Sequence, residues 1–309
     1  MSASTPAVSG LVKRLQSLKA RFAPVIGGAL LGLVLYWGWT FREAIEASFR
    51  NLGILGLGIL ASSIMVTLIL TVTALVILVR DKGYAFRFPD GYHSLNVSQL
   101  ASMIPGGIWG YAGFAGVLWS KGISKADSVI IVLFYTVLML SACAVVGISG
   151  LGAILGRGYA LIALLPLMFL LMGRNWLDRL RQRHFPATSP LPSRGASIRV
   201  LVLGILIWVI TSVSFAWLLY RTEGYGVIPL WTVVGAYAAG YLGGYIAIFA
   251  PSGIGVSEGL VGLLLGPYVG VGNVLGIAIS FRIVQTIVTW CNILLTVVVL
   301  SREKGREQA

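Results

Sequence analysis

The stretch Ala247–Gly262, AIFAPSGIGVSEGLVG, places a glycine-rich turn in the middle of apolar sequence. Pro251 has no backbone N–H, and the glycines beside it disfavour a helix, so a membrane helix that enters this stretch must break here. Glu258 follows the break almost at once. Broken backbone inside a membrane must be covered by protein or line a cavity, and ionisable groups there are costly. The stretch therefore predicts a functional site.

The same pattern occurs 146 residues earlier, in Ala101–Gly116, ASMIPGGIWGYAGFAG. The two stretches share a proline, a Gly-Ile pair and two further glycines at one constant spacing. Interrupted apolar segments at corresponding places in two halves are typical of transporters that bind their substrate near the membrane midplane. We expect two broken or re-entrant helices related by an internal repeat. The positions expected to break them are Pro105, Gly106, Gly107, Trp109 and Gly113, and then Pro251, Gly253, Gly255 and Gly259.

The composition is that of a membrane protein, with 57% hydrophobic and 11% charged residues. A hydrocarbon core of about 30 Å needs about 20 helical residues per crossing, which leaves little of the 309 residues for a soluble domain. We predict an all-α, polytopic membrane helix bundle of about seven to eight spans. A span from Pro229 to Ala250 is expected before the second motif, and a polar connector from Phe41 to Arg50 before the span Leu52 to Val79.

The orientation of the repeat stays open in the sequence. If both motifs are re-entrant, four crossings separate them and the repeat is parallel, whereas one full crossing makes it inverted. Residues 1–23 are expected to be a disordered start and a basic amphipathic surface helix. Residues 24–300 form one transmembrane domain, with halves 24–173 and 199–300 joined by the basic loop 174–198. Residues 301–309 form a polar tail.

The net charge of +13 comes from Lys and Arg in short segments that flank apolar spans. Such segments indicate topology and contacts with anionic lipid headgroups, so nucleic acid is not an expected partner. They predict a multi-pass protein of the cell membrane with a cytoplasmic N-terminus. The basic tail favours a cytoplasmic C-terminus. The oligomeric state cannot be read from these patterns.

Arg282 lies about a dozen residues into the last span, where an unpaired cation costs at least roughly 2.5 to 3.5 kcal/mol. Glu258 is the one carboxylate embedded comparably in the sequence. The two side chains form either a structural ion pair or a headgroup site, in which Arg282 holds a lipid phosphate and Glu258 balances or gates it. Four polar residues follow Arg282 on one helical face, namely Gln285, Thr289, Asn292 and Thr296.

Tyr237, Tyr241 and Tyr245 also share one helix face, beside a strip of small residues that permits a close helix neighbour. These rings either pack in the core or line a path for a headgroup. The residues expected to contact substrate are Glu258, Arg282, Gln285, Thr289, Asn292, Ser252, Ser257, Tyr241 and Tyr245.

Catalytic patterns are sparse. His93 and His184 lie in or near basic segments without paired carboxylates, and we expect them to be solvated. We predict no metal site and no cofactor, and the absence of a phosphate-binding glycine loop excludes an ATP-driven pump within this chain. Cys143 and Cys291 fall inside apolar spans and indicate no disulfide framework.

The sequence resembles the flippase-like membrane domain of lysylphosphatidylglycerol synthases, which also occurs as stand-alone proteins. The resemblance rests on IPGGIW at Ile104–Trp109, GISK at Gly122–Lys125, APSGIGVSEG at Ala250–Gly259 and the span around Arg282. It extends over residues 24–300. Phe114 stands where members usually carry an arginine after the first motif's glycine.

The resemblance implies that an anionic or glycosylated lipid is moved between leaflets, with Glu258 and Arg282 at the matching polar positions. The aminoacyl-transfer domain of those synthases has no counterpart in this sequence, so lysine transfer is not expected. The leading hypothesis is a lipid flippase that acts without ATP hydrolysis on an anionic phospholipid or a polyprenyl-phosphate-linked sugar. The alternatives are a membrane enzyme acting on a lipid-linked substrate, and a non-catalytic partner of a glycosyltransferase or other envelope enzyme.

Overall fold

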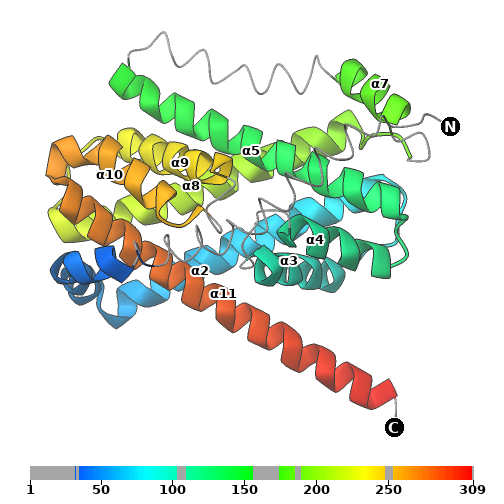
Figure 1. Cartoon of the computed structure of the whole chain (residues 1–309), viewed down its shortest axis with the longest axis horizontal. Coiled ribbons are helices and arrows are strands. Elements are labelled where there is room, and N and C mark those ends of the chain that lie inside the picture. The colour runs from blue at the N-terminus through cyan, green and yellow to red at the C-terminus, as the bar shows by residue number, and fades with distance from the viewer. Residues whose placement is uncertain are drawn as a thin grey trace, which may run out of the picture.

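The computed structural model describes residues 32, 35–102, 109–155, 174–184, 189–247 and 253–307, and these residues contain helices but no strands (Figure 1). The helices are α2 Arg42–Asp81, α3 Phe88–Ser102, α4 Trp109–Ser120, α5 Lys125–Leu155, α7 Arg174–His184, α8 Arg194–Glu223, α9 Leu230–Ile246, α10 Val256–Val269 and α11 Val271–Glu307. The all-helical prediction is confirmed for this part of the chain. The expected surface helix within residues 1–23 and the residues 156–173 lie outside it.

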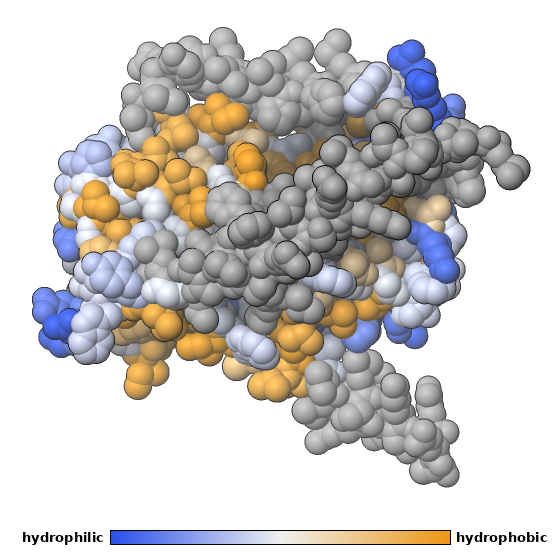
Figure 2. Space-filling model, in the orientation of Figure 1, coloured by the Kyte–Doolittle hydropathy of each residue, from blue (hydrophilic) through white to orange (hydrophobic). Residues whose placement is uncertain are grey.

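Four helices are long and apolar enough to cross a membrane, and they lie within α2, α5, α8 and α11. Among the coloured residues in this view, apolar ones form patches over the middle of the molecule, while strongly hydrophilic ones gather mainly toward its left and right ends (Figure 2). Ile54, for example, is 91% exposed on α2, as expected for a side chain that faces acyl chains. The described residues therefore indicate a membrane protein.

The connector expected at Phe41 to Arg50 is helical, because α2 begins at Arg42 and includes this segment. Arg42, Glu46 and Arg50 recur every four residues, so their charges share one face of the helix and are compatible with it. The interruption comes later, at Gly53, whose φ of 60° lies in the left-handed region that glycine tolerates.

The long helices α2 and α8 pack antiparallel along their lengths. Near one end the Arg221 guanidinium donates to the Asn51 carbonyl at 2.9 Å, and further along the Ser214 hydroxyl donates to the Ser63 hydroxyl at 2.9 Å. At the other end the Ser193 hydroxyl donates to Asp81 at 2.6 Å. The C-terminus of α2 and the C-terminus of α8 therefore lie at opposite ends of the bundle.

Each of the two motifs joins a pair of short helices that pack side by side (Figure 1). In the first pair α3 has 15 residues and α4 has 12, and in the second α9 has 17 and α10 has 14. At about 1.5 Å per residue, α3, α4 and α10 are too short to cross about 30 Å of hydrocarbon, and α9 is at the lower limit. Within the span expected from Pro229 to Ala250, the described helix α9 forms one arm of a helical hairpin with α10.

Glycines set the spacing within both hairpins. A Cβ on Gly110 would lie 3.0 Å from the Ser102 Cβ, and a Cβ on Gly244 would lie 2.9 Å from the Ser257 Cβ. A Cβ on Gly240 would be only 2.5 Å from a Val261 methyl carbon. The small-residue strip predicted beside the tyrosines thus does permit a close helix neighbour, and that neighbour is α10.

The hairpins open at opposite ends of the bundle. The α3–α4 hairpin starts after α2 ends and finishes just before α5, whereas the α9–α10 hairpin starts after α8 ends and finishes just before α11. We call the end with α3 and α4 the basic end, since it carries Arg80, Lys82, Arg87, Lys121 and Lys125. The opposite end carries Arg42 with Glu43, and Arg221 with Glu223.

A buried polar cluster closes the basic end. The Lys82 ammonium lies 2.8 Å from Asp127, and the two side chains are 0% and 5% exposed. Asp127 also accepts hydrogen bonds from the Tyr84 hydroxyl at 2.6 Å and from the Ser189 hydroxyl at 3.0 Å. Burial and the hydrogen bond to Asp127 raise the pKa of Tyr84 above its usual value. Because every charge here has a partner, this cluster ties α2, α5 and the segment before α8 together.

Candidate functional site

The second motif positions a carboxylate at the start of α10. Gly253 and Gly255 have φ values of 68° and 87°, which only glycine adopts readily. The turn that they form starts α10 at Val256, so Glu258 is the third residue of the helix. The Gly255 N–H donates to Glu258 Oε2 at 2.8 Å, as in one half of a capping box, and the positive pole of the helix favours the negative charge.

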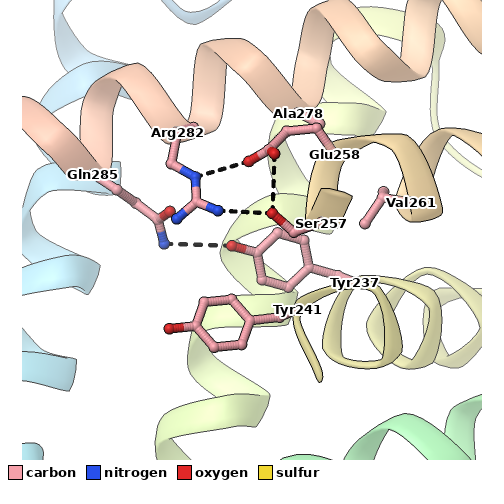
Figure 3. Close-up of a pocket in the computed structure, with 8 residues that line it drawn as sticks. All are labelled: Tyr237, Tyr241, Ser257, Glu258, Val261, Ala278, Arg282 and Gln285. Carbon is pink, nitrogen blue, oxygen red and sulfur yellow. Dashed lines mark hydrogen bonds and ion pairs between the residues drawn. The ribbon is translucent and has the colours of Figure 1, made fainter. Parts of the chain in front are cut away.

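Arg282 on α11 completes an ion pair with this carboxylate. Its Nε donates to Glu258 Oε1 at 2.8 Å, and its Nη2 donates to the Ser257 hydroxyl at 2.7 Å (Figure 3). Glu258 is 7% exposed, while the Arg282 side chain is 23% exposed. The interpretation of a Glu258–Arg282 contact is confirmed. The opposite charges of the two side chains compensate each other inside the bundle, as the burial of charged groups requires.

Ser257 joins both charged groups and has two acceptors for its single hydroxyl hydrogen. Its oxygen lies 3.0 Å from Glu258 Oε2 and 3.1 Å from the Gly253 carbonyl. The hydroxyl can therefore donate to the carboxylate, or it can turn to the carbonyl while its oxygen accepts another hydrogen.

The pair borders a small hollow of about 10 Å³, which is about the space of one water molecule. The residues that line it are Tyr237, Tyr241, Ser257, Glu258, Val261, Ala278, Arg282 and Gln285, drawn from α9, α10 and α11 (Figure 3). Within the described residues, Arg282 Nη1 and the Tyr241 hydroxyl make no hydrogen bond. Two donors thus remain beside a hollow with room for about one water molecule, so a phosphate group would have to widen it.

Aromatic packing fixes the wall of the hollow. The Tyr237 ring stacks on Phe215 at 4.7 Å between centroids and meets Phe281 edge-on at 5.5 Å. Gln285 Nε2 donates to the Tyr237 hydroxyl at 3.4 Å. Tyr241 packs on Trp208 at 4.5 Å. Tyr237 was missing from the expected substrate contacts, although its place in the tyrosine ladder, four residues before Tyr241, was a usable signal.

Five of the expected substrate contacts gather at this hollow, namely Glu258, Arg282, Gln285, Ser257 and Tyr241. Thr289, Asn292 and Tyr245 are described but do not line it. Ser252 lies outside the described residues, as do Pro105, Gly106, Gly107 and Pro251. Among the other motif residues, Trp109 is 47% exposed at the start of α4, Gly113 lies at a close contact with Ala101, and Gly259 lies within α10.

Asn292 has a different role from the one expected. It is 2% exposed, and its Oδ1 accepts a hydrogen bond from the Tyr92 hydroxyl at 2.6 Å. One turn further along α11, Thr296 accepts from Asn96 Nδ2 at 2.7 Å. Ten residues of helix place Asn292 about 15 Å along the axis from Arg282. The lower part of the polar stripe therefore binds α3 and does not face the hollow.

His93 is not solvated in a loop as expected, since it lies within α3 and its buried Nδ1 has no hydrogen-bond partner among the described residues. The side chain of His184 lies outside the description. Among the described residues no three His, Cys, Asp or Glu side chains come together as a metal site would require. Both cysteines are free thiols.

No protein-family model matches the chain, and no curated protein is significantly similar to it in sequence.

Proposed function

We propose that this protein is a lipid translocator that moves an anionic phospholipid or a polyprenyl-phosphate-linked sugar between membrane leaflets without ATP hydrolysis. The observation that carries the proposal is a guanidinium, bound to a carboxylate at the turn of a broken helical hairpin, beside a small open hollow. A purely structural ion pair would be expected to have tight packing on all sides. Here the Arg282 side chain is 23% exposed and borders a small hollow.

The chemistry of Arg282 favours a phosphate. A guanidinium presents planar N–H groups that bind two phosphate oxygens at once, and such charge-assisted bonds are strong where water is scarce. Nη1 and the Tyr241 hydroxyl are donors without acceptors in the described structure. A headgroup phosphate that widens the hollow and enters it would accept from both, while its acyl chains stay in the surrounding bilayer.

The internal repeat supports the same proposal. Each half reads as a long helix, two short helices and a long helix, first α2 to α5 and then α8 to α11. Residues 146 positions apart also make corresponding contacts between the halves. Val146 and Ala238 share one apolar cluster. Asn292 corresponds to Val146 and Tyr92 corresponds to Ala238, and these two residues hydrogen-bond to each other. Because α2 and α8 are antiparallel, we infer that the repeat is inverted and that both hairpins are re-entrant. This is the arrangement of many secondary transporters.

The two halves differ at the site. At the positions 146 residues before Glu258 and Arg282 stand Ala112 and Thr136, so the first half offers no ion pair. The proposed headgroup contact is therefore confined to the second half. Residues of the first half would serve as the opposing wall of the path.

We further propose that the basic end faces the cytoplasm. Its Lys and Arg residues follow the positive-inside rule and would contact anionic headgroups there, whereas the charges at the opposite end are balanced by glutamates. The C-terminal end of α11 points toward the basic end in the same view (Figure 1). This agrees with a cell-membrane protein whose C-terminus is cytoplasmic.

The test is transbilayer movement in liposomes that contain the purified protein and one fluorescent lipid at a time. The panel includes phosphatidylglycerol, a polyprenyl phosphate and uncharged diacylglycerol. We expect acceleration for the phosphate lipids, and a loss of about tenfold or more in Arg282→Gln, since hydrogen bonds to charged groups contribute about 1.5 to 3 kcal/mol. The matched control is Arg42→Gln, which removes the same charge from a pair that is 52% and 89% exposed.

Unchanged activity in Arg282→Gln, or no acceleration of any phosphate lipid by folded protein, would contradict the proposal. Chemical conversion of a lipid-linked substrate that disappears in Glu258→Gln would point to the membrane enzyme instead.

A further inference from the structure

We propose that Glu258 carries one proton together with each anionic headgroup, so that the translocator is a proton symporter. This inference rests on the proposed function and adds its coupling ion. It starts from the charges that face Glu258. From α11 comes Arg282, from α9 come the phenols Tyr237 and Tyr241, and α10 itself adds the neutral Ser257. No other ionisable side chain lines the described part of the hollow.

The site without substrate is neutral, because it holds one guanidinium and one carboxylate in direct contact at 2.8 Å. A phosphodiester that enters adds one negative charge. The guanidinium cannot compensate two anions, and an uncompensated charge away from water is strongly unfavourable. A buried carboxylate that loses its cation is neutralised by a proton. The headgroup and the proton therefore enter the site together.

The geometry around Ser257 accommodates both protonation states of Glu258. In the ionised state the Ser257 hydroxyl donates to Glu258 Oε2, 3.0 Å away. In the protonated state Oε2–H donates to the Ser257 oxygen, and the serine hydrogen turns to the Gly253 carbonyl at 3.1 Å. The Gly255 N–H can donate to a lone pair of Oε2 in either state. Glu258 Oε2 and the Ser257 hydroxyl therefore have hydrogen-bond partners in both protonation states.

The exchange at the site is balanced. A hydronium ion on one side of the membrane gives its proton to Glu258 Oε2, where an O–H bond forms and a water molecule leaves. The headgroup phosphate accepts from Arg282 Nη1 and the Tyr241 hydroxyl, and Arg282 Nε then turns from Glu258 Oε1 to another phosphate oxygen. On the other side the headgroup leaves, Oε2–H gives its proton to water, and the ion pair forms again. One anion and one proton cross, so no net charge moves.

The experiment uses liposomes that contain the full-length protein, fluorescent phosphatidylglycerol and an internal pH-sensitive dye, with a pH gradient imposed across the membrane. We expect wild-type protein to accumulate the lipid in the leaflet facing the alkaline side, up to about tenfold per pH unit for one proton per lipid. Proton entry should accompany lipid entry at a ratio near one. Glu258→Gln should abolish both the gradient response and the proton signal.

Glu43→Gln is the matched control, because it neutralises a carboxylate that is 89% exposed and also paired with an arginine. It should keep the full gradient response. Ser257→Ala is a second variant that keeps the ion pair but removes the acceptor for the proton. It should move lipid only at lower pH than wild type.

Lipid movement that ignores the pH gradient and occurs without proton uptake would overturn the symport and leave the proposed function intact. Proton movement that persists in Glu258→Gln would assign the proton to another group and also overturn it. If wild-type protein moves no lipid under any gradient, the symport falls together with the proposed function.

Discussion

Arg282 has two of its three guanidinium nitrogens bound to α10, although it lies on a helix that is otherwise largely apolar. The contact is costly to break from one side, because the remaining charge stays in the bundle without compensation. It is much less costly to remove as a whole. Comparing the cost of removing one partner with the cost of removing both therefore shows whether the ion pair adds net stability or only offsets the cost of burying its charges.

We predict that Arg282→Met lowers the free energy of unfolding by about 3 kcal/mol, the low end of the range for buried pairs, since the arginine is 23% exposed. The double variant Glu258→Gln with Arg282→Met should recover most of this loss. Denaturant titrations in detergent measure both. Additive losses in the double variant would show that the two side chains act independently.

Single residues of the site differ in how well their roles could be predicted from the sequence. The break at Gly253 and the buried carboxylate at Glu258 were predictable, because positive φ angles and embedded charges leave direct marks in the sequence. The role of Asn292 was not. It shares a helical face with Arg282, but a face does not tell where along a helix of 37 residues the neighbour changes from α10 to α3.

At the scale of elements, the two hairpins are attached to the bundle in different ways. The α9–α10 hairpin is held to α5 by direct backbone contact, since a Cβ on Gly150 would lie 2.4 Å from the Gly235 Cα. The α3–α4 hairpin meets α11 through two side-chain hydrogen bonds, from Tyr92 to Asn292 and from Asn96 to Thr296. The α3–α4 hairpin also packs apolar side chains against α2 and α5, so the hydrogen bonds to α11 are one part of its attachment.

Gly150→Ala should therefore destabilise the protein by about 1 to 3 kcal/mol, because its new methyl group would meet the backbone of α9 and cannot be accommodated by rotation. Gly116→Ala is the matched control on α4, where no heavy atom lies within 4 Å of the added Cβ. It should be neutral or stabilising by up to about 1 kcal/mol. Thermal unfolding of both variants in detergent compares them. Equal effects would contradict close packing of α5 and α9.

The hydrogen bonds between α3 and α11 should also limit the mobility of the α3–α4 hairpin. We predict that Tyr92→Phe together with Thr296→Val raises the hydrogen-exchange rate of α3 and α4 by roughly fivefold for each lost hydrogen bond. The α9–α10 hairpin in the same variant is the internal control and should be unchanged. A uniform rise in both hairpins would mean that the whole bundle loosens and that these contacts do not hold one hairpin.

At the scale of the whole molecule, the sequence predicted a helical membrane bundle with two related breaks but left the orientation of the repeat open. The reason lies in α9. Its 17 residues are close to the length of a crossing, and its tyrosine periodicity continues toward the second motif, so a span and a hairpin arm look alike. Only the antiparallel contacts of Gly240 and Gly244 with α10 distinguish them. With α9 as a hairpin arm, the repeat that we propose would be inverted.

An inverted repeat of re-entrant hairpins makes a direct prediction about accessibility. Both ends of the α3–α4 hairpin should be reached from the cytoplasm, and both ends of α9–α10 from the opposite side. Single cysteines at Arg87, Lys121, Leu230 and Tyr268 test this in a Cys291→Ser background, since these side chains are exposed and Cys143 is buried. A membrane-impermeant thiol reagent added to oriented vesicles should label the first two from the cytoplasmic face and the last two from the other. Labelling of the two ends of either hairpin from different faces would show that this hairpin crosses the membrane, which would make the inverted re-entrant arrangement wrong.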